Sequence, residues 1–530
     1  MRDQHRSFIH SRRRWPLVVA IAMALVWLMS MGHAQEPQYG GTLTIGYHIQ
    51  LADGLDVMAT TNVRDDVAQM VFEPLMTFDE NFEPAPILAA SWNTSDDELT
   101  WTFDLRQGVT FHDGTPMTAA DVEASFTRFM NMGQRRGEFA RVEAWRAVDE
   151  NTFEITVETP WAALTESLSM PSAAFVVMPT RVAEAYADSR LPIQAIEDNV
   201  GTGPYRLVTV ERERRYEFER FEDYVSPPGE PSGFAGARHA YVDRIVLLPI
   251  TEDATRSAAL FAGEVDLTTE HPAEDLQRLM DTPTTQAQPA LPGLRVYLKL
   301  NVFDGPFADP VLRRAVMAAI DHEMVMAAQG PRELWRVNPT PRFQEPQWMW
   351  DPIAYEYYPN DLELARFLVE RSDYDGRTIR FMHNTDWENP MRTGPVVQEL
   401  MRDIGLNVEL VTVDTATFFS LWTQFDTWDI KSSAGGSEVT TSYLDAASRT
   451  RDGQRWPGWP PEWDYYMEVV QTESDRDVRK NALRNLYRLS AEMAAEIYLG
   501  EVSVVYGARD YVRNVPSWPI PNYWNVWLDR

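Results

Sequence analysis

The sequence predicts a mixed α/β fold with two or more lobes, and two observations lead to this prediction. The chain has 530 residues, 44% of them hydrophobic, so it can bury a large core but is long for one ordinary domain. Segments with the period of a strand and segments with the period of a helix follow one another along the chain. Aromatic residues make up 12% of the chain, which argues against disorder.

The charge and the cysteine count exclude several classes of function. The formal net charge is −31 and the pI is about 4.7, so we expect no nucleic-acid partner, because phosphate binding needs a basic surface. The acidity is typical of a well-solvated surface, and a preference for cationic ligands is the second interpretation. Without cysteine there is no disulfide, Cys-ligated zinc site, iron–sulfur cluster or thiol nucleophile.

Residues 1–34 have the three parts of a signal peptide. Five arginines form a basic start, residues 17–31 form an uncharged apolar run, and Gly32-His33-Ala34 offers small residues for cleavage. We predict that the protein is exported and that this segment is removed after Ala34. An uncleaved membrane anchor is the alternative, although the run is short for a span of about 20 residues. The arginines before the run also resemble a twin-arginine signal, so both export routes, Sec and Tat, stay open.

Residues 85–130 predict a strand, a tight turn and a helix, in that order. Apolar and polar residues alternate over 99–105, which is the pattern of a half-buried strand. Glycine, proline and aspartate within 107–116 then supply turn chemistry. Thr118 and Asp121 predict a capped helix start. The apolar stripe of this helix contains Val122, Phe126, Phe129 and Met130.

Other elements follow in chain order. Glycines at 40 and 41 open a first strand, and residues 290–300 alternate as a strand that marks the crossing into a second lobe. Asp309-Pro310 then caps and starts a helix. The string Gly-Thr-Gly at 201–203 lacks the spacing of a phosphate loop and is followed by a strand instead of a helix.

Several strings in this order closely resemble one protein family. They are Val-Phe-Glu-Pro-Leu at 71–75, the whole of 85–130, Gly-Thr-Gly-Pro-Tyr-Arg-Leu at 201–207, residues 242–266 and residues 301–321. The family that they resemble is the extracytoplasmic solute-binding proteins of ABC importers, family 5, of the dipeptide/oligopeptide-binding type. The resemblance extends over nearly all of residues 36–515.

The resemblance implies a two-lobe periplasmic binding protein fold of type II, in the large cluster that has an extra subdomain in lobe 1. The loop at 48–61 is then expected near the cleft between the lobes. The implied domains are the signal peptide at 1–34, lobe 1 at 35–289 with an inserted subdomain at about 75–200, lobe 2 at 290–500, and a return to lobe 1 at 501–530.

The resemblance also implies the function of a periplasmic substrate-binding component of an ABC importer. Such a protein captures a peptide-like or other small solute in its cleft and delivers it to an inner-membrane permease. We expect a monomer without cofactor, metal or catalytic residue. The nine histidines lack metal spacing, and His112 is expected to form hydrogen bonds in a loop. A secreted hydrolase is the rival hypothesis, in which Asp386 paired with Glu388 or Glu438 would cut glycosides.

In the peptide-binding members, two charged residues hold the ends of the ligand, and both positions differ here. The segment from Ser433 to Glu438 matches the one whose aspartate pairs with the peptide amino terminus, but Ser437 occupies that position. The arginine that holds the peptide carboxylate corresponds to a position near Asp386, ahead of Trp-Glu-Asn-Pro at 387–390. An acid there repels a carboxylate, so we predict that neutral dipeptides with free termini bind poorly.

Two kinds of ligand stay open from these residues. A cationic or neutral peptide-like solute would use the carboxylates of Asp386, Glu388 and Glu438. A sugar-like solute would stack on Trp387, Phe419, Trp422 or Trp428, with carboxylates accepting hydrogen bonds from its hydroxyls, although side chains of this size pack more often in cores. The alternative function is accordingly an oligosaccharide- or opine-binding member of the same family. The predicted ligand-binding residues are Asp386, Trp387, Glu388, Phe419, Trp428, Ser433, Gly435, Gly436, Ser437 and Glu438.

Overall fold

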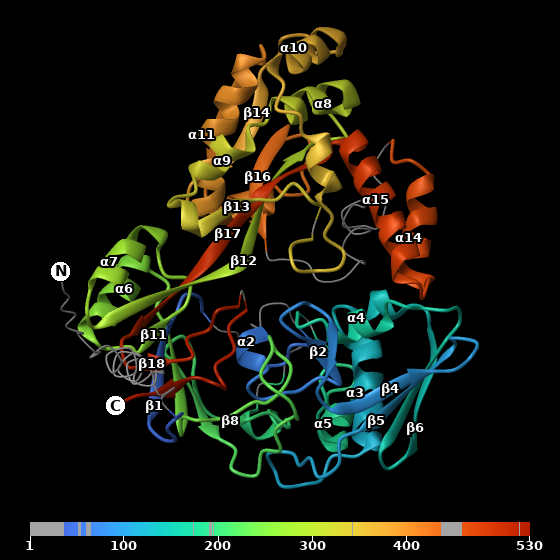
Figure 1. Ribbon diagram of the computed structural model, residues 1–530, viewed down its shortest axis with the longest axis vertical. Coiled ribbons are helices and arrows are strands. Elements are labelled where there is room, and N and C mark those ends of the chain that lie inside the picture. The colour runs from blue at the N-terminus through green and yellow to red at the C-terminus, as the bar shows by residue number, and fades with distance from the viewer. Residues whose placement is uncertain are drawn as a thin grey trace, which may run out of the picture. The chain divides into compact units, whose positions relative to one another are not determined.

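The largest sheet within the described residues has 11 strands and connects both halves of the chain (Figure 1). Its order is β15-β14-β16-β12-β17-β11-β1-β10-β9-β8, and β13 pairs with β17 off this path. The strands are β1 (Thr42–Tyr47), β8 (Tyr205–Glu211), β9 (Arg215–Arg220), β10 (Arg244–Pro249), β11 (Leu267–Thr268), β12 (Thr285–Leu300), β13 (Trp335–Val337), β14 (Ile379–Asn384), β15 (Val408–Val413), β16 (Ile430–Gly435) and β17 (Glu496–Arg509).

This computed structural model describes residues 36–50, 55–59, 65–172, 174–189, 193, 195–341, 343–435, 458–518 and 520–530. The predicted signal peptide lies outside the described residues, as does part of the loop that we expect near the cleft. Residues Tyr39–Arg530 form one compact unit. Within the described part of the chain, no helix combines the length and the apolar character that crossing a membrane requires.

Helices pack against the large sheet at strands that precede and at strands that follow β12 and β17 in the strand order. Helix α11 contacts β14, β15 and β16, and α6 contacts β1 and β11. Helix α8 begins at the predicted cap, because the Asp309 carboxylate accepts the Val311 N–H at 2.8 Å. The helices that matter here are α6 (Asp253–Ala262), α7 (Leu276–Asp281), α8 (Pro310–Ala319), α9 (His322–Ala327), α10 (Leu362–Arg371), α11 (Glu388–Asp403), α12 (Thr415–Ser420), α14 (Glu462–Thr472) and α15 (Arg476–Met493).

A separate four-stranded sheet contains the strand predicted within residues 85–130, and the helix predicted there packs against this sheet. The predicted strand is β5, which buries Phe103 and leaves Trp101 half-buried. The predicted helix is α3, and its first turn is capped as expected, since the Thr118 N–H donates to Asp121 Oδ2 at 2.9 Å. These elements are β4 (Ala89–Thr94), β5 (Thr100–Leu105), β6 (Val142–Asp149), β7 (Thr152–Val157) and α3 (Ala119–Met132).

The two largest hydrophobic cores among the described residues lie on either side of a crossing made by β12 and β17. One core gathers mainly residues between 43 and 247, and the other gathers residues between 296 and 502. The two strands run side by side between the cores (Figure 1). They pair antiparallel, with a register shift between Ala290 and Leu294. The chain therefore passes between the two cores along a pair of hydrogen-bonded strands. The exact lobe boundaries stay a prediction.

Distant family-like strings meet through buried hydrogen bonds. The Thr202 hydroxyl donates to the Glu73 carboxylate at 2.8 Å. His112 accepts the Gly201 N–H on Nδ1 at 3.3 Å, and its Nε2 lies 2.9 Å from a carbonyl oxygen of the same glycine string. A Cβ on Gly201 would come within 2.0 Å of the Val71 carbonyl oxygen, so this close approach requires glycine. The glycine string is thus a packing motif, and His112 is a hydrogen-bonded loop residue, as predicted.

The burial of His112 predicts a loss of stability in acid. Burial lowers the pKa of His112 from 6.5 to about 4. Because the unfolded chain binds this proton below pH 6.5 and the folded protein does not, the free energy of unfolding falls as the pH drops from 6.5 towards 4. We expect this one residue to account for a loss of about 3 kcal/mol at the acid end.

Urea unfolding across this pH range checks the prediction. His112→Asn keeps a donor and an acceptor but does not titrate, so its stability should change less with pH than that of the wild type. His239→Asn, at a half-buried position, is the control and should keep the wild-type slope. An unchanged slope in His112→Asn would contradict the assignment.

Candidate functional site

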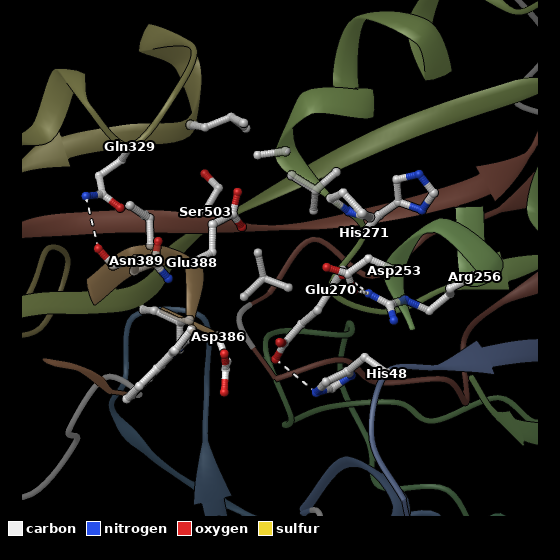
Figure 2. Close-up of a pocket in the computed structure, with 18 residues that line it drawn as sticks. His48, Asp253, Arg256, Glu270, His271, Gln329, Asp386, Glu388, Asn389 and Ser503 are labelled. Carbon is white, nitrogen blue, oxygen red and sulfur yellow. Dashed lines mark hydrogen bonds and ion pairs between the residues drawn. The ribbon is translucent and has the colours of Figure 1, made fainter. Parts of the chain in front are cut away.

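A cavity of about 230 Å³ lies where residues of both halves of the chain meet beside the β12–β17 crossing (Figure 2). One wall comes from the end of β1, from α6 and from the segment after β11. The other wall comes from the segment after α9 and from the loop between β14 and α11, and β17 lies between the two walls. The polar and aromatic residues that line the cavity are His48, Asp253, Arg256, Glu270, His271, Gln329, Asp386, Trp387, Glu388, Asn389 and Ser503.

Two histidines stand on the first wall, and protein groups orient both. His48 Nε2 lies 3.1 Å from Glu270 Oε1 (Figure 2). His48 Nδ1 lies 2.8 Å from the Thr269 hydroxyl. His271 Nδ1 lies 2.8 Å from the Thr268 hydroxyl. Burial lowers the pKa of His271 to about 4, so this imidazole is neutral near neutral pH. His271 therefore adds no positive charge to the wall.

Arg256 is the positively charged residue of the first wall, and both of its terminal nitrogens donate hydrogen bonds to protein oxygens. The side chain is buried, with 1% exposed. Nη2 donates to Asp253 Oδ1 and to the carbonyl oxygen of Glu270, both at 2.6 Å, and Nη1 donates to the carbonyl oxygen of Ile250 at 2.9 Å. Arg256 therefore holds the first wall together through contacts within the protein.

The second wall is shaped by a turn at the end of β14. Asn384 Oδ1 accepts the N–H groups of Asp386 at 2.9 Å and of Trp387 at 2.7 Å, which is an Asx turn. The Thr415 N–H then donates to Asp386 Oδ2 at 3.1 Å and ties this loop to the start of α12. Asn384 is fully buried, so the turn is anchored in the protein interior. The sequence Asn-Thr-Asp-Trp thereby places Asp386 and Trp387 on the cavity.

Glu388 begins α11 and forms an ion pair with Arg392 one turn later. Arg392 also donates from Nη1 to the Gln329 carbonyl oxygen at 2.6 Å, and its Nη2 lies 3.7 Å from Glu274 Oε2 on the opposite wall. Burial raises the pKa of Glu388, and Arg392 opposes this shift. Arg392 thus links the two walls through these contacts.

Acidic side chains outnumber basic side chains among the residues that line the cavity. Four lining residues carry carboxylates: Asp253, Glu270, Asp386 and Glu388. Among the lining residues, Arg256 is the one guanidinium, and the histidines are His48 and His271. Opposite charges lower each other's energy at short range, so such a site favours a positively charged group and disfavours a carboxylate.

Three of the predicted ligand-binding residues line the cavity, namely Asp386, Trp387 and Glu388. Trp428 does not: it is 1% exposed, and its indole N–H donates to the Leu421 carbonyl oxygen at 3.1 Å. Ser433 and Gly435 lie on β16 away from the lining, and Ser433 is 2% exposed. Phe419 is also off the lining but is exposed. The remaining predicted residues, Gly436, Ser437 and Glu438, lie outside the described residues.

The sequence prediction missed most of the first wall. Asp253, Glu270 and His271 carry no motif that marks a binding site, and they converge only because β11 lies between β1 and β17 in the sheet. His48 belongs to the loop that the sequence places near a cleft, so a partial signal existed for it. Among the described residues, no group of histidines and acidic side chains could hold a metal ion.

Two walls, one from the elements around β1 and β11 and the other from those around β14 and α11, enclose a small polar cavity beside a pair of shared strands. This arrangement is that of a two-lobe binding protein that closes around a small solute.

Comparison with known proteins agrees with this class. The model of the bacterial extracellular solute-binding proteins, family 5, matches residues 83–454, and the chain belongs to this family. It is 27% identical over 489 residues to a probable peptide ABC transporter periplasmic-binding protein of Sinorhizobium fredii, covering 89% of this chain and 90% of the relative. The chain is therefore an extracellular solute-binding protein of family 5, similar to periplasmic substrate-binding components of ABC importers.

Solved structures share the fold. AgaA from A. tumefaciens R10, in complex with agropinic acid, has a TM-score of 0.74 and 21% identity, covering 92% of this chain and 99% of AgaA. DppA from Helicobacter pylori, in complex with the peptide STSA, has a TM-score of 0.74 and 19% identity, covering 93% of this chain and 99% of DppA. The predicted two-lobe α/β fold is confirmed.

Proposed function

We propose that the protein binds a small peptide-like solute through a positively charged amino group and releases it unchanged to its permease. The observation that carries this proposal is the excess of carboxylates around the cavity. Arg256 pairs with Asp253 and Arg392 pairs with Glu388, so the carboxylates of Glu270 and Asp386 give the lining its excess of negative charge. The lining therefore offers an amino group more favourable partners than it offers a carboxylate.

The size of the cavity supports the same proposal. Its volume of about 230 Å³ is below the roughly 300–1,000 Å³ of pockets that enclose drug-sized ligands. It therefore suits the charged end of a solute and not a whole oligopeptide. The relative from Sinorhizobium fredii is named for peptides, which supports a peptide-like solute. An opine or an oligosaccharide is the alternative.

The proposal also covers how the protein is exported and whether its carboxylates catalyse a reaction. We infer that the signal peptide is cleaved after Ala34 and that the mature chain acts as a monomer in the periplasm. The carboxylates of Asp386 and Glu388 then bind and do not catalyse. Incubation with chromogenic glycosides and chromogenic peptides should give no turnover, and turnover would favour the hydrolase hypothesis.

A thermal-shift screen of the mature protein tests the ligand class. Alanyl-alanine amide, which carries a cationic amino group and no carboxylate, should raise Tm, whereas alanyl-alanine with free termini should not. Asp386→Asn should weaken binding of the amide about tenfold, equivalent to about 1.4 kcal/mol. This change removes one charge of the wall but keeps an oxygen that can accept the Thr415 N–H.

Glu363→Gln, at an exposed position of α10, is the matched control and should leave the affinity unchanged. Binding of alanyl-alanine as tight as that of its amide would contradict a preference for cations. A Tm shift with maltotriose or with octopine, and none with the amide, would favour the alternative ligands.

A further inference from the structure

Three aromatic side chains beside the cavity form what we call the aromatic shelf: Trp387, Phe419 and Trp422. The ring of Phe419 lies 6.0 Å from that of Trp422 at an angle of 24°, and 6.2 Å from that of Trp387 at 34°. The first pair is stacked and the second is tilted, and both separations are typical of aromatic rings in contact. Phe419 is nevertheless 55% exposed, although it is the middle ring of the three. The protein thus holds a large apolar ring in contact with water.

The shelf is rigid because it is supported from the core. Lys431 is fully buried on β16, and its Nζ lies 3.5 Å from the ring centre of Trp422. The same Nζ donates to the Trp422 carbonyl oxygen at 3.0 Å. Phe418, which is also fully buried, meets Trp422 edge to face at 5.6 Å. Trp422 is therefore held at its backbone and at its ring, and it presents a fixed surface to Phe419.

The shelf is continuous with the acidic cavity. Trp387 belongs to both, because it lines the cavity and its ring lies beside that of Phe419. The Asx turn at Asn384 fixes the backbone of Trp387 next to Asp386. A carboxylate for an amino group and an apolar surface for a side chain thus lie on adjacent residues.

We propose that the aromatic shelf binds a planar apolar side chain of the same solute whose amino group enters the acidic cavity. This inference rests on the proposed function and narrows it to peptide-like solutes that carry an aromatic residue. Covering the exposed ring of Phe419 removes apolar surface from water on both partners, and stacking adds to this gain. Charge complementarity at the cavity and aromatic contact at the shelf then select the same molecule.

The affinities of two probes test the proposal by isothermal titration calorimetry. We expect the wild type to bind alanyl-phenylalanine amide about tenfold more tightly than alanyl-alanine amide. Phe419→Ala should lose this difference while its affinity for alanyl-alanine amide stays within about twofold of the wild type. The fluorescence of the shelf tryptophans should change with the phenylalanine probe in the wild type and change less in the variant.

Tyr465→Ala is the matched control, because Tyr465 is 65% exposed on α14 and is outside the shelf. It should keep the tenfold difference. Equal affinities of the two amides for the wild type, or an undiminished difference in Phe419→Ala, would overturn the shelf but leave the proposed function intact. Binding of neither amide would overturn the proposed function itself, and quenching by cellobiose alone would assign the shelf to a sugar.

Discussion

Replacing Glu73 by glutamine should lower the free energy of unfolding by about 3–5 kcal/mol, because the change leaves a buried cation without its partner. Glu73 is fully buried and accepts hydrogen bonds from the hydroxyls of Thr202 and Tyr224, both at 2.8 Å. Its Oε1 also lies 3.2 Å from Arg238 Nη1, and Arg106 approaches to 4.0 Å. An amide fits the same space but brings no negative charge to two guanidinium groups.

Urea unfolding monitored by circular dichroism measures this loss. Glu264→Gln, at an exposed position just after α6, removes the same charge at the surface and should change stability by less than about 0.5 kcal/mol. A similar small effect of Glu73→Gln would show that the network around Glu73 does not hold the glycine string in place.

Replacing Gly293 by alanine should disrupt the crossing between the two cores. A Cβ at this position would lie 2.0 Å from the Val502 carbonyl oxygen, 2.8 Å from the Val504 nitrogen and 3.0 Å from the carbonyl carbon of Ser503. All three atoms belong to the backbone of β17, so no side chain can rotate away, and the two strands must separate. We expect a loss of about 3 kcal/mol or more and weaker binding of alanyl-alanine amide, since Ser503 lines the cavity.

Thermal unfolding and calorimetry on the same samples separate these two effects. Gly137→Ala is the control, because nothing lies within 4 Å of the added methyl group and no positive φ is required there. It should leave binding unchanged and alter stability by no more than about 1 kcal/mol. Wild-type stability of Gly293→Ala would show that the crossing strands have room to move apart.

Local patterns were sufficient to predict much of the fold. The alternation around Phe103 and the cap at Thr118 depend only on neighbouring residues, and both elements form where the sequence predicts them. The strand at 290–300 is also present, as the second half of the longer β12. The family-like strings added the two-lobe architecture, which periodicity alone does not specify.

The binding site was harder to predict, because it depends on pairings between distant segments. Asp386 and Glu388 lie beside a family-like string, whereas Glu270 reaches the cavity only through the neighbours of β11 in the sheet. The sequence also could not separate Phe419 from Trp428. Both are aromatic residues in one short segment, yet one is 55% exposed and the other 1% exposed.

The paired strands β12 and β17 limit how the two halves can move. Backbone hydrogen bonds join them across the passage between the cores, so sliding one half past the other would break a whole row of these bonds. Bending or twisting the ribbon preserves them. The two halves should consequently move by a hinge rotation about these paired strands. We expect the hinge at the irregular register near Leu294.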